Sequence, residues 1–353
     1  MKTKHLNFYI LVFIFFGCHK APSAPAISST DMEATVIKDF VSNVALGQYS
    51  NLTNAAVALN GAITSLNSNL TNDNLVAAQT AWKNLRQVWE QSEGFLFGPV
   101  EDNDYDPNTD TWPTDYVQMD SVLASSNPLQ VSDVASLQQS LRGYHPLEYI
   151  IFGKGEVRTV AQLNPRLMQY ATSLAADILY NNVQPLYESW ASNSNGYAQQ
   201  VLNAGNGSSK FPTRRDLFIT IVSAMSDICD EVGREKMYGP FINHDSTITE
   251  SPYSNNTLTD FKNNIIGARN VYLGLNNGSG IKDLVASKNK NLNNQIQSQM
   301  NAAISSFDNI TVSYEQAIFI QRTQVQQTIT QINALNDLLD NDLKNFIIQY
   351  VQD

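Results

Sequence analysis

Apolar residues recur at intervals of three and four positions over long stretches of this chain. Three series show the spacing: Ala56, Leu59, Ile63, Leu66 and Leu70; Leu75, Ala78, Trp82, Leu85 and Trp89; and Val325, Ile329, Ile332, Leu339, Leu343 and Ile347. This spacing places the apolar side chains on one face of an α-helix, and Thr71-Asn72 supplies an N-cap between the first two series. No segment alternates with a period of two. The sequence therefore predicts an all-α protein of long helices packed as bundles.

Segments rich in Asn, Gly and Ser are predicted to connect these helices, notably residues 101–111 and 192–209. The second segment is expected to separate two packed helical-bundle halves, residues 31–200 and 210–353. Short motifs echo across this break: Glu93 with Gly98-Pro99, and Glu235 with Gly239-Pro240. An ancient duplication and chance are both possible explanations of these repeated motifs, and both stay open.

Residues 1–17 have the pattern of a secretory signal peptide. Two lysines precede the apolar run Phe8–Phe16, which is too short to cross a membrane. A small residue and then Cys18 follow, as in bacterial lipoproteins, in which the cysteine is lipidated and becomes the new N-terminus. Residues 18–30 then form the lipidated cysteine and a flexible spacer. The chain is thus expected on the outer membrane or another periplasm-facing membrane. The alternative is an ordinary signal peptide with an incidental cysteine.

The chain is acidic once this leader is removed. The leader holds two of the 22 basic residues and no acidic one, so 20 basic residues remain against 33 acidic ones, a balance of −13. This balance, without a basic patch, argues against nucleic acid as a partner. Cys229 is the only cysteine besides Cys18, so no internal disulfide is expected. Only His145 and His244 lie in the folded part, which excludes a site built from many histidines.

The sharpest candidate for a functional site is Gly143-Tyr144-His145-Pro146-Leu147-Glu148. Residues three apart share one face of a helix, so the imidazole of His145 and the carboxylate of Glu148 can meet one cation. The alternative is structural: Pro146 disfavours helical backbone at His145, which makes His145 the N-cap and Glu148 a capping carboxylate. Both interpretations allow the two side chains to point into a cleft.

Two ligands are too few for a metal site, so further carboxylates are needed. Arg86, Glu90 and Glu93 follow one another at helical spacing, and Glu93 continues the preceding apolar stripe. A carboxylate on a buried stripe requires a cation, and Arg86 is the alternative to a metal in that role. Asp115 and Asp120 supply carboxylates after the acidic segment. Oxygen-rich surroundings with one nitrogen favour iron, manganese or calcium over a structural zinc.

Several motifs occur in an order shared with a known family. They are Arg86, Glu93 with Phe95-Leu96-Phe97-Gly98, Trp112-Pro113 with Asp115 and Asp120, Gly143 to Tyr149, Gly233-Arg234-Glu235-Lys236-Met237, Glu250 to Thr257 with Asp260, and Val271-Tyr272-Leu273-Gly274. Together they span roughly residues 30–350 and resemble the imelysin family, also called the insulin-cleaving membrane protease or iron-regulated protein A group. One departure is Glu250, where many relatives have His before the Ser-x-x-Ser motif.

The resemblance implies one of two activities. The family was named for metallopeptidases, with the histidine–glutamate motif as the supposed centre, and its members are also iron-regulated surface lipoproteins. A zinc-peptidase helix usually presents two histidines with a glutamate as base. This chain has one histidine in the motif, and Glu148 would have to serve as both ligand and base. The residues therefore favour binding over catalysis.

We therefore expect a lipid-anchored extracytoplasmic protein that binds iron, another divalent or trivalent cation, or an iron-bearing ligand, and presents it to an uptake protein in the membrane. The expected metal ligands are His145, Glu148, Glu93 and Asp115. Residues expected to orient them or to close the cleft between the halves are Arg86, Glu90, Arg234 and Glu235. The alternatives are an imelysin-type metallopeptidase with His145 and Glu148 as its centre, and a scaffold or adhesion lipoprotein without metal.

Overall fold

The computed structural model describes residues 29–154, 157–191 and 196–351. Within these ranges the chain consists of helices and their connections and contains no β-strand, so the predicted all-α fold is confirmed. The predicted leader, the lipidation residue Cys18 and most of the spacer lie outside the described residues. None of the helices in the described part is long and apolar enough to cross a membrane.

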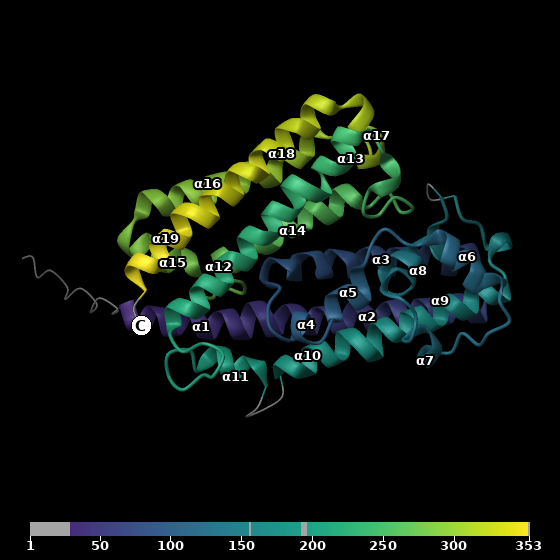
Figure 1. The fold of residues 1–353 in the computed structure, drawn as a ribbon, viewed down its shortest axis with the longest axis horizontal. Helices are drawn as coiled ribbons and strands as arrows, with labels where there is room; N and C mark the ends of the chain where they lie inside the picture. The colour runs from purple at the N-terminus through teal and green to yellow at the C-terminus, as the bar shows by residue number, and fades with distance from the viewer. Residues whose placement is uncertain (1–28, 155–156, 192–195, 352–353) are drawn as a thin grey trace, which may run out of the picture.

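The first half of the chain forms one group of long helices, coloured purple to teal in Figure 1. α1 (Ser29–Asp39), the π-helical turn η1 (Phe40–Ala45) and α2 (Leu46–Ser68) continue without a break, and α2 packs against α3 (Asn72–Ser92). A second rod packs against α2 and consists of α9 (Pro165–Asp177), η5 (Ile178–Val183) and α10 (Gln184–Ala191). The short helix α8 (Tyr144–Phe152) lies against both α3 and α9.

Local sequence signals account for these long helices. Thr71 caps α3 as predicted, because its side chain accepts a hydrogen bond from the Asn74 amide at 3.3 Å. The predicted apolar stripes of α2 and α3 are buried. Leu70 differs: it lies beyond the end of α2 at Ser68 and is 43% exposed.

Short helices fill much of the rest of this half. They are η2 (Glu93–Phe95), α4 (Pro99–Asp102), α5 (Tyr105–Asp110), α6 (Tyr116–Ala124), α7 (Val131–Val134), η3 (Gln139–Leu141), η4 (Val160–Gln162) and α11 (Tyr197–Leu202). The prediction of plain connections at 101–111 and 192–209 was therefore wrong where α4, α5 and α11 form. Buried residues such as Val100 and Val201 give these short segments a packing partner that their polar composition concealed.

The second half forms another group, coloured green to yellow in Figure 1. Its elements are α12 (Arg214–Asp230), η6 (Glu231–Lys236), α13 (Tyr238–Asn243), η7 (Ser246–Ile248), α14 (Thr257–Leu273), α15 (Ile281–Lys288), α16 (Lys290–Ser306), η8 (Phe307–Asn309), α17 (Tyr314–Ile320), α18 (Arg322–Asp337), η9 (Leu338–Leu343) and α19 (Lys344–Tyr350). The last three continue without a break. They confirm the predicted long final helix, and its apolar stripe is buried.

The two groups meet where α3 and η2 pack against α14. Glycines permit the close approach, since a Cβ atom on Gly94 would lie 2.5 Å from the carbonyl carbon of Gly267. The buried apolar residues of both groups form one continuous core. The halves at 31–200 and 210–353 and their origin by duplication stay predictions.

Candidate functional site

The histidine–glutamate motif lies in the first turns of α8. Gly143 precedes the helix with a φ of 83°, and a Cβ atom there would overlap the Thr109 carbonyl group, so this position requires glycine. The N-cap is Gly143 and not His145, so the helix-cap interpretation of His145 was wrong. His145 and Glu148 are both buried and face each other, with 3.5 Å between Nδ1 and Oε2.

His145 bridges two carboxylates. Its Nε2 lies 3.0 Å from Asp110 Oδ1, and its Nδ1 faces Glu148. Burial opposes a charged imidazole, but the hydrogen bonds to Asp110 and Glu148 outweigh burial and raise the pKa of His145 to about 9. Both ring nitrogens of His145 are therefore protonated at neutral pH in this arrangement, and a metal must displace one of these protons to bind the imidazole.

Glu148 joins α8 to the second half of the chain. Its Oε1 accepts hydrogen bonds from the amide of Tyr253 at 3.0 Å, the amide of Ser254 at 2.8 Å and the hydroxyl of Ser254 at 2.7 Å. Glu148 thus anchors the turn that precedes α14. The Ser-x-x-Ser motif was recognised in the sequence, but no spacing rule linked it to Glu148.

Arg86 lies at the centre of the buried charges. Its guanidinium contacts Glu90 and Asp110, lies 3.0 Å from Glu250 Oε1 and lies 3.7 Å from Asp260 Oδ1. The Arg86 charge and the hydrogen bond from His145 outweigh burial and hold the pKa of Asp110 well below its usual range. Arg86 therefore contacts four carboxyl groups, and Glu93 is not one of them.

Glu93 pairs with other groups. Its Oε2 accepts a hydrogen bond from Asn264 Nδ2 at 2.7 Å and lies 3.7 Å from Lys236 Nζ. Lys236 also lies 3.3 Å from Glu250 Oε1 and 3.1 Å from the half-exposed Glu231. Lys236 and Arg86 are thus the two fixed cations of the site.

The structure brings together only part of the predicted set. Asp115 caps α6, since its Oδ1 accepts the Gln118 amide at 2.9 Å, and it belongs to neither metal-ligand group described below. Arg234 is exposed and pairs with Asp230 and Asp337, while Glu235 is exposed beside it. These three residues do not join the cluster around Arg86.

We use the term acidic cluster for the buried carboxyl groups around Arg86 and Lys236. Its members are Glu90, Glu93, Asp110, Glu148, Glu250 and Asp260. Burial raises the pKa of Glu90 and of Glu93 well above the usual range, and it raises the pKa of Asp260 to about 7. Among the described atoms, Glu250 Oε2 and Asn264 Oδ1 are buried without a hydrogen-bond partner. Six carboxyl groups thus share two fixed cations and His145.

Two sets of side chains in the acidic cluster have the spacing of metal ligands. Ligand atoms of Asp110, His145 and Glu250 lie within 4.8 Å of one another, and so do those of Glu90, Glu93 and Asp110. Carboxylate oxygens with one imidazole nitrogen suit iron or manganese. Glu250 Oε2 has no hydrogen-bond partner and is available to coordinate a metal ion, so the residues present fit such a cation. Asp110 and Glu250 were not predicted as ligands.

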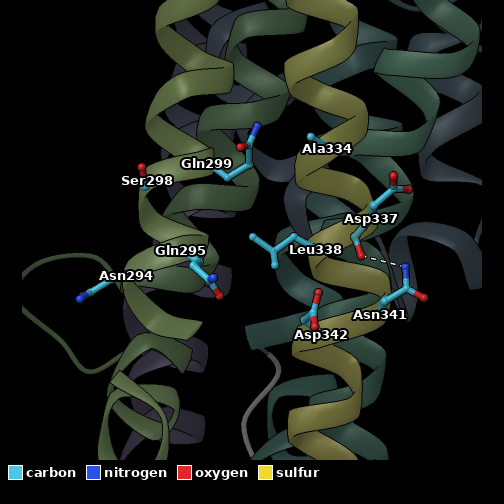
Figure 2. A pocket seen from close by; sticks show the side chains of 9 residues that line it. All are labelled: Asn294, Gln295, Ser298, Gln299, Ala334, Asp337, Leu338, Asn341 and Asp342. Atoms are coloured by element: carbon cyan, nitrogen blue, oxygen red, sulfur yellow. Dashed lines mark hydrogen bonds between the residues drawn. The ribbon is translucent and has the colours of Figure 1, made fainter. Parts of the chain in front are cut away.

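A polar groove of about 750 Å³ lies away from the acidic cluster, between α16 and the rod of α18 and η9. Figure 2 shows its lining of amide and carboxylate side chains, among them Asn294, Gln295, Asp337 and Asn341. None of the cluster residues lines this groove.

Comparison with known proteins agrees with the ordered motifs. The family model Peptidase_M75, described as Imelysin, matches residues 45–341, which is most of the chain. The chain belongs to the imelysin family. It is similar to iron-regulated protein A of Synechococcus elongatus, with 34% identity over 240 residues, 67% of this chain and 64% of that protein. The match thus spans slightly less than two thirds of that relative.

Solved structures share the fold of this imelysin-family chain. A protein of Parabacteroides distasonis, described as a candidate iron-regulated protein A precursor, has a TM-score of 0.83 at 23% identity, over 93% of this chain and 97% of that one. An imelysin-like protein of Psychrobacter arcticum has a TM-score of 0.74 at 11% identity, over 93% and 99% of the two chains. At these identities the similarity establishes the fold alone.

Proposed function

We propose that this protein binds iron, or a cation of similar chemistry, in the acidic cluster. The observation that carries the proposal is the surplus of buried carboxyl groups over cations, since six carboxyl groups meet only two fixed cations and one histidine, and burial raises the pKa of three of them. A buried carboxylate is costly without a positive charge or a proton. A bound cation supplies that charge and gives Glu250 Oε2 a partner.

Two observations connect the proposed site with iron: the chemistry of its ligands and the similarity to a relative. The donor set of carboxylates with His145 suits ferrous or ferric iron, and a relative with 34% identity is named iron-regulated protein A. The predicted leader and Cys18 support a lipid-anchored protein outside the cytoplasm that presents the cation to an uptake protein.

The hydrolase alternative requires Glu148 to act as a general base. Its Oε1 already accepts three hydrogen bonds, and its Oε2 faces His145. This geometry supports a role for Glu148 in holding the turn at Tyr253 and Ser254. A peptidase would lose cleavage, but keep its metal, in the Glu148→Gln variant.

Calorimetric titration with Fe²⁺ under anaerobic conditions, and with Mn²⁺, tests the proposal. We expect binding with a dissociation constant of about 1 μM or tighter, which is about −8 kcal/mol. The double variant His145→Gln/Asp110→Asn should lose this binding. Asp115→Asn is the matched control, because Asp115 caps α6 outside the cluster. Equal affinity in the wild type and the double variant would contradict the proposal.

A further inference from the structure

A second cavity lies beside the acidic cluster but is separate from it. This cleft has a volume of about 980 Å³ and is lined by residues from both halves of the chain. Its lining residues come from α6, α8, η7 and α17, and from the turn that precedes α14. Its size and its position between two packed groups are typical of small-molecule sites.

Three tyrosines form an aromatic wall in the cleft. The ring centres of Tyr116, Tyr149 and Tyr253 lie 5.1 to 5.4 Å apart. The ring planes are inclined to one another by 51° to 78°, so the rings pack edge to face in one aromatic cluster and leave no cage for a cation between them. All three are half-buried and keep part of their surface toward the cleft.

The Arg158 guanidinium is held in a fixed position beside this wall. The Arg158 guanidinium lies 5.6 Å from the ring centre of Tyr149 and donates hydrogen bonds at 2.9 Å to the backbone carbonyls of Tyr149 and Ile150. The other charged residues in the lining are Lys154 and Glu315. The two cations and one anion leave an excess of one positive charge, which does not match a ligand that carries several charges.

The remaining polar lining is mostly uncharged and includes unsatisfied acceptors. Hydroxyl and amide side chains line the cleft: Ser246, Thr247, Asn255, Gln162 and Gln316. Among the described atoms, Ser313 Oγ and Glu315 Oε2 are buried without a hydrogen-bond partner, while Glu315 Oε1 accepts the Thr257 hydroxyl at 2.6 Å. Both residues line the cleft, so a rotation of either side chain brings its unpaired oxygen to a ligand that supplies donors.

We propose that the cleft binds a neutral hexose oligosaccharide. The apolar faces of sugar rings fit against the wall formed by Tyr116, Tyr149 and Tyr253, and sugar hydroxyls donate to Glu315 Oε2 and exchange hydrogen bonds with Ser313 and the amides. A peptide is the less favoured ligand, because the described residues around the cleft offer no strand edge for main-chain pairing.

Titration with three neutral glucose trimers, maltotriose, cellotriose and laminaritriose, in the presence of a chelator tests this proposal. The chelator makes the result independent of cation binding in the acidic cluster. We expect at least one trisaccharide to bind, with affinity at least tenfold weaker in Tyr253→Ala and in Glu315→Gln. Tyr253 holds Glu148 through its backbone amide, so the loss of its side chain leaves that bond in place. Tyr238→Ala is the matched control, because Tyr238 is 43% exposed outside the cleft.

Three results would overturn the proposal. The first is that none of the three sugars binds to the wild-type protein. The second is binding that neither Tyr253→Ala nor Glu315→Gln weakens, which would place the sugar elsewhere. The third is that trialanine binds in place of the sugars with the same sensitivity to both variants, which would make the cleft a peptide site.

Discussion

Arg86 is the residue on which the buried charges depend most. It is fully buried and contacts four carboxylates, which no other described cation approaches together. Its removal would leave Glu90, Asp110 and Glu250 facing one another in a medium of low dielectric constant. The arginine is therefore expected to stabilise the fold as well as the site.

We predict that Arg86→Met lowers the free energy of unfolding by about 3–5 kcal/mol, the usual cost of breaking a buried pair. Arg234→Met should lower it by less than about 1 kcal/mol, since its pairs with Asp230 and Asp337 are exposed. Urea unfolding followed by circular dichroism measures both values. Equal losses in the two variants would show that Arg86 contributes no more than a surface arginine.

The ammonium group of Lys236 lies in the site, so a bound metal ion must compete with it for the carboxylates. Its ammonium lies among Glu93, Glu231 and Glu250, at 3.1 to 3.7 Å. We predict that Lys236→Met tightens Mn²⁺ binding about tenfold, which corresponds to about 1.4 kcal/mol. Lys262→Met is the control, because Lys262 pairs with Asp308 at the surface. Unchanged or weaker binding in Lys236→Met would rule out this competition.

At the scale of elements, the crossing of η2 and α14 sets the distance between the two helical groups. A Cβ atom on Gly267 would overlap the backbone of Gln91. We predict that Gly267→Ala lowers the free energy of unfolding by about 1–3 kcal/mol, the cost of overpacking. Gly61→Ala in α2 should be neutral or stabilising by up to about 1 kcal/mol, because a Cβ there meets nothing within 4 Å. Thermal unfolding of both variants checks the contrast.

The helices were predictable from the sequence because their signals are local. Apolar spacing and the cap at Thr71 suffice for α2, α3 and the final rod. The site was predictable only where it lies on such helices, at Arg86, Glu90, Glu93 and on the helix bearing His145 and Glu148. The family motifs singled out further positions but did not show which of them meet.

The missed members of the site come from irregular segments. Asp110 ends the short helix α5, in an acidic stretch without apolar periodicity. Lys236 ends η6, a π-helical turn whose extra residue changes the helical phase. That change directs Lys236 into the core and leaves Arg234 and Glu235 outside, whereas the sequence motif alone favoured the latter pair. Contacts set by tertiary packing have no signature in local spacing.

At the scale of the whole molecule, the acidic cluster links the first group of helices to the second. Arg86 reaches Glu250, Glu93 reaches Asn264, and Glu148 holds the turn at Ser254, so each link joins residues far apart in the sequence. A change of charge in the acidic cluster therefore alters the contacts between the two groups of helices.

The turn at residues 250–255 connects the acidic cluster to the cleft. Glu250 and Ser254 face the acidic cluster, while Pro252, Tyr253 and Asn255 line the cleft. If both proposals hold, a cation and a sugar order the same turn and should bind cooperatively. Mn²⁺ is then expected to tighten sugar binding about fivefold or more, and the sugar must tighten Mn²⁺ binding by the same factor.

Paired titrations of the sugar with and without Mn²⁺ measure this coupling. Ser254→Ala removes the hydroxyl bond to Glu148 but leaves the side chains of Asp110, His145 and Glu250 unchanged. It should therefore reduce the coupling, while the cation alone and the sugar alone still bind. Ser305→Ala, on the exposed side of α16, is the control. Sugar affinity that is the same with and without Mn²⁺ would show two independent sites. The turn would then serve only to hold Glu148 in place.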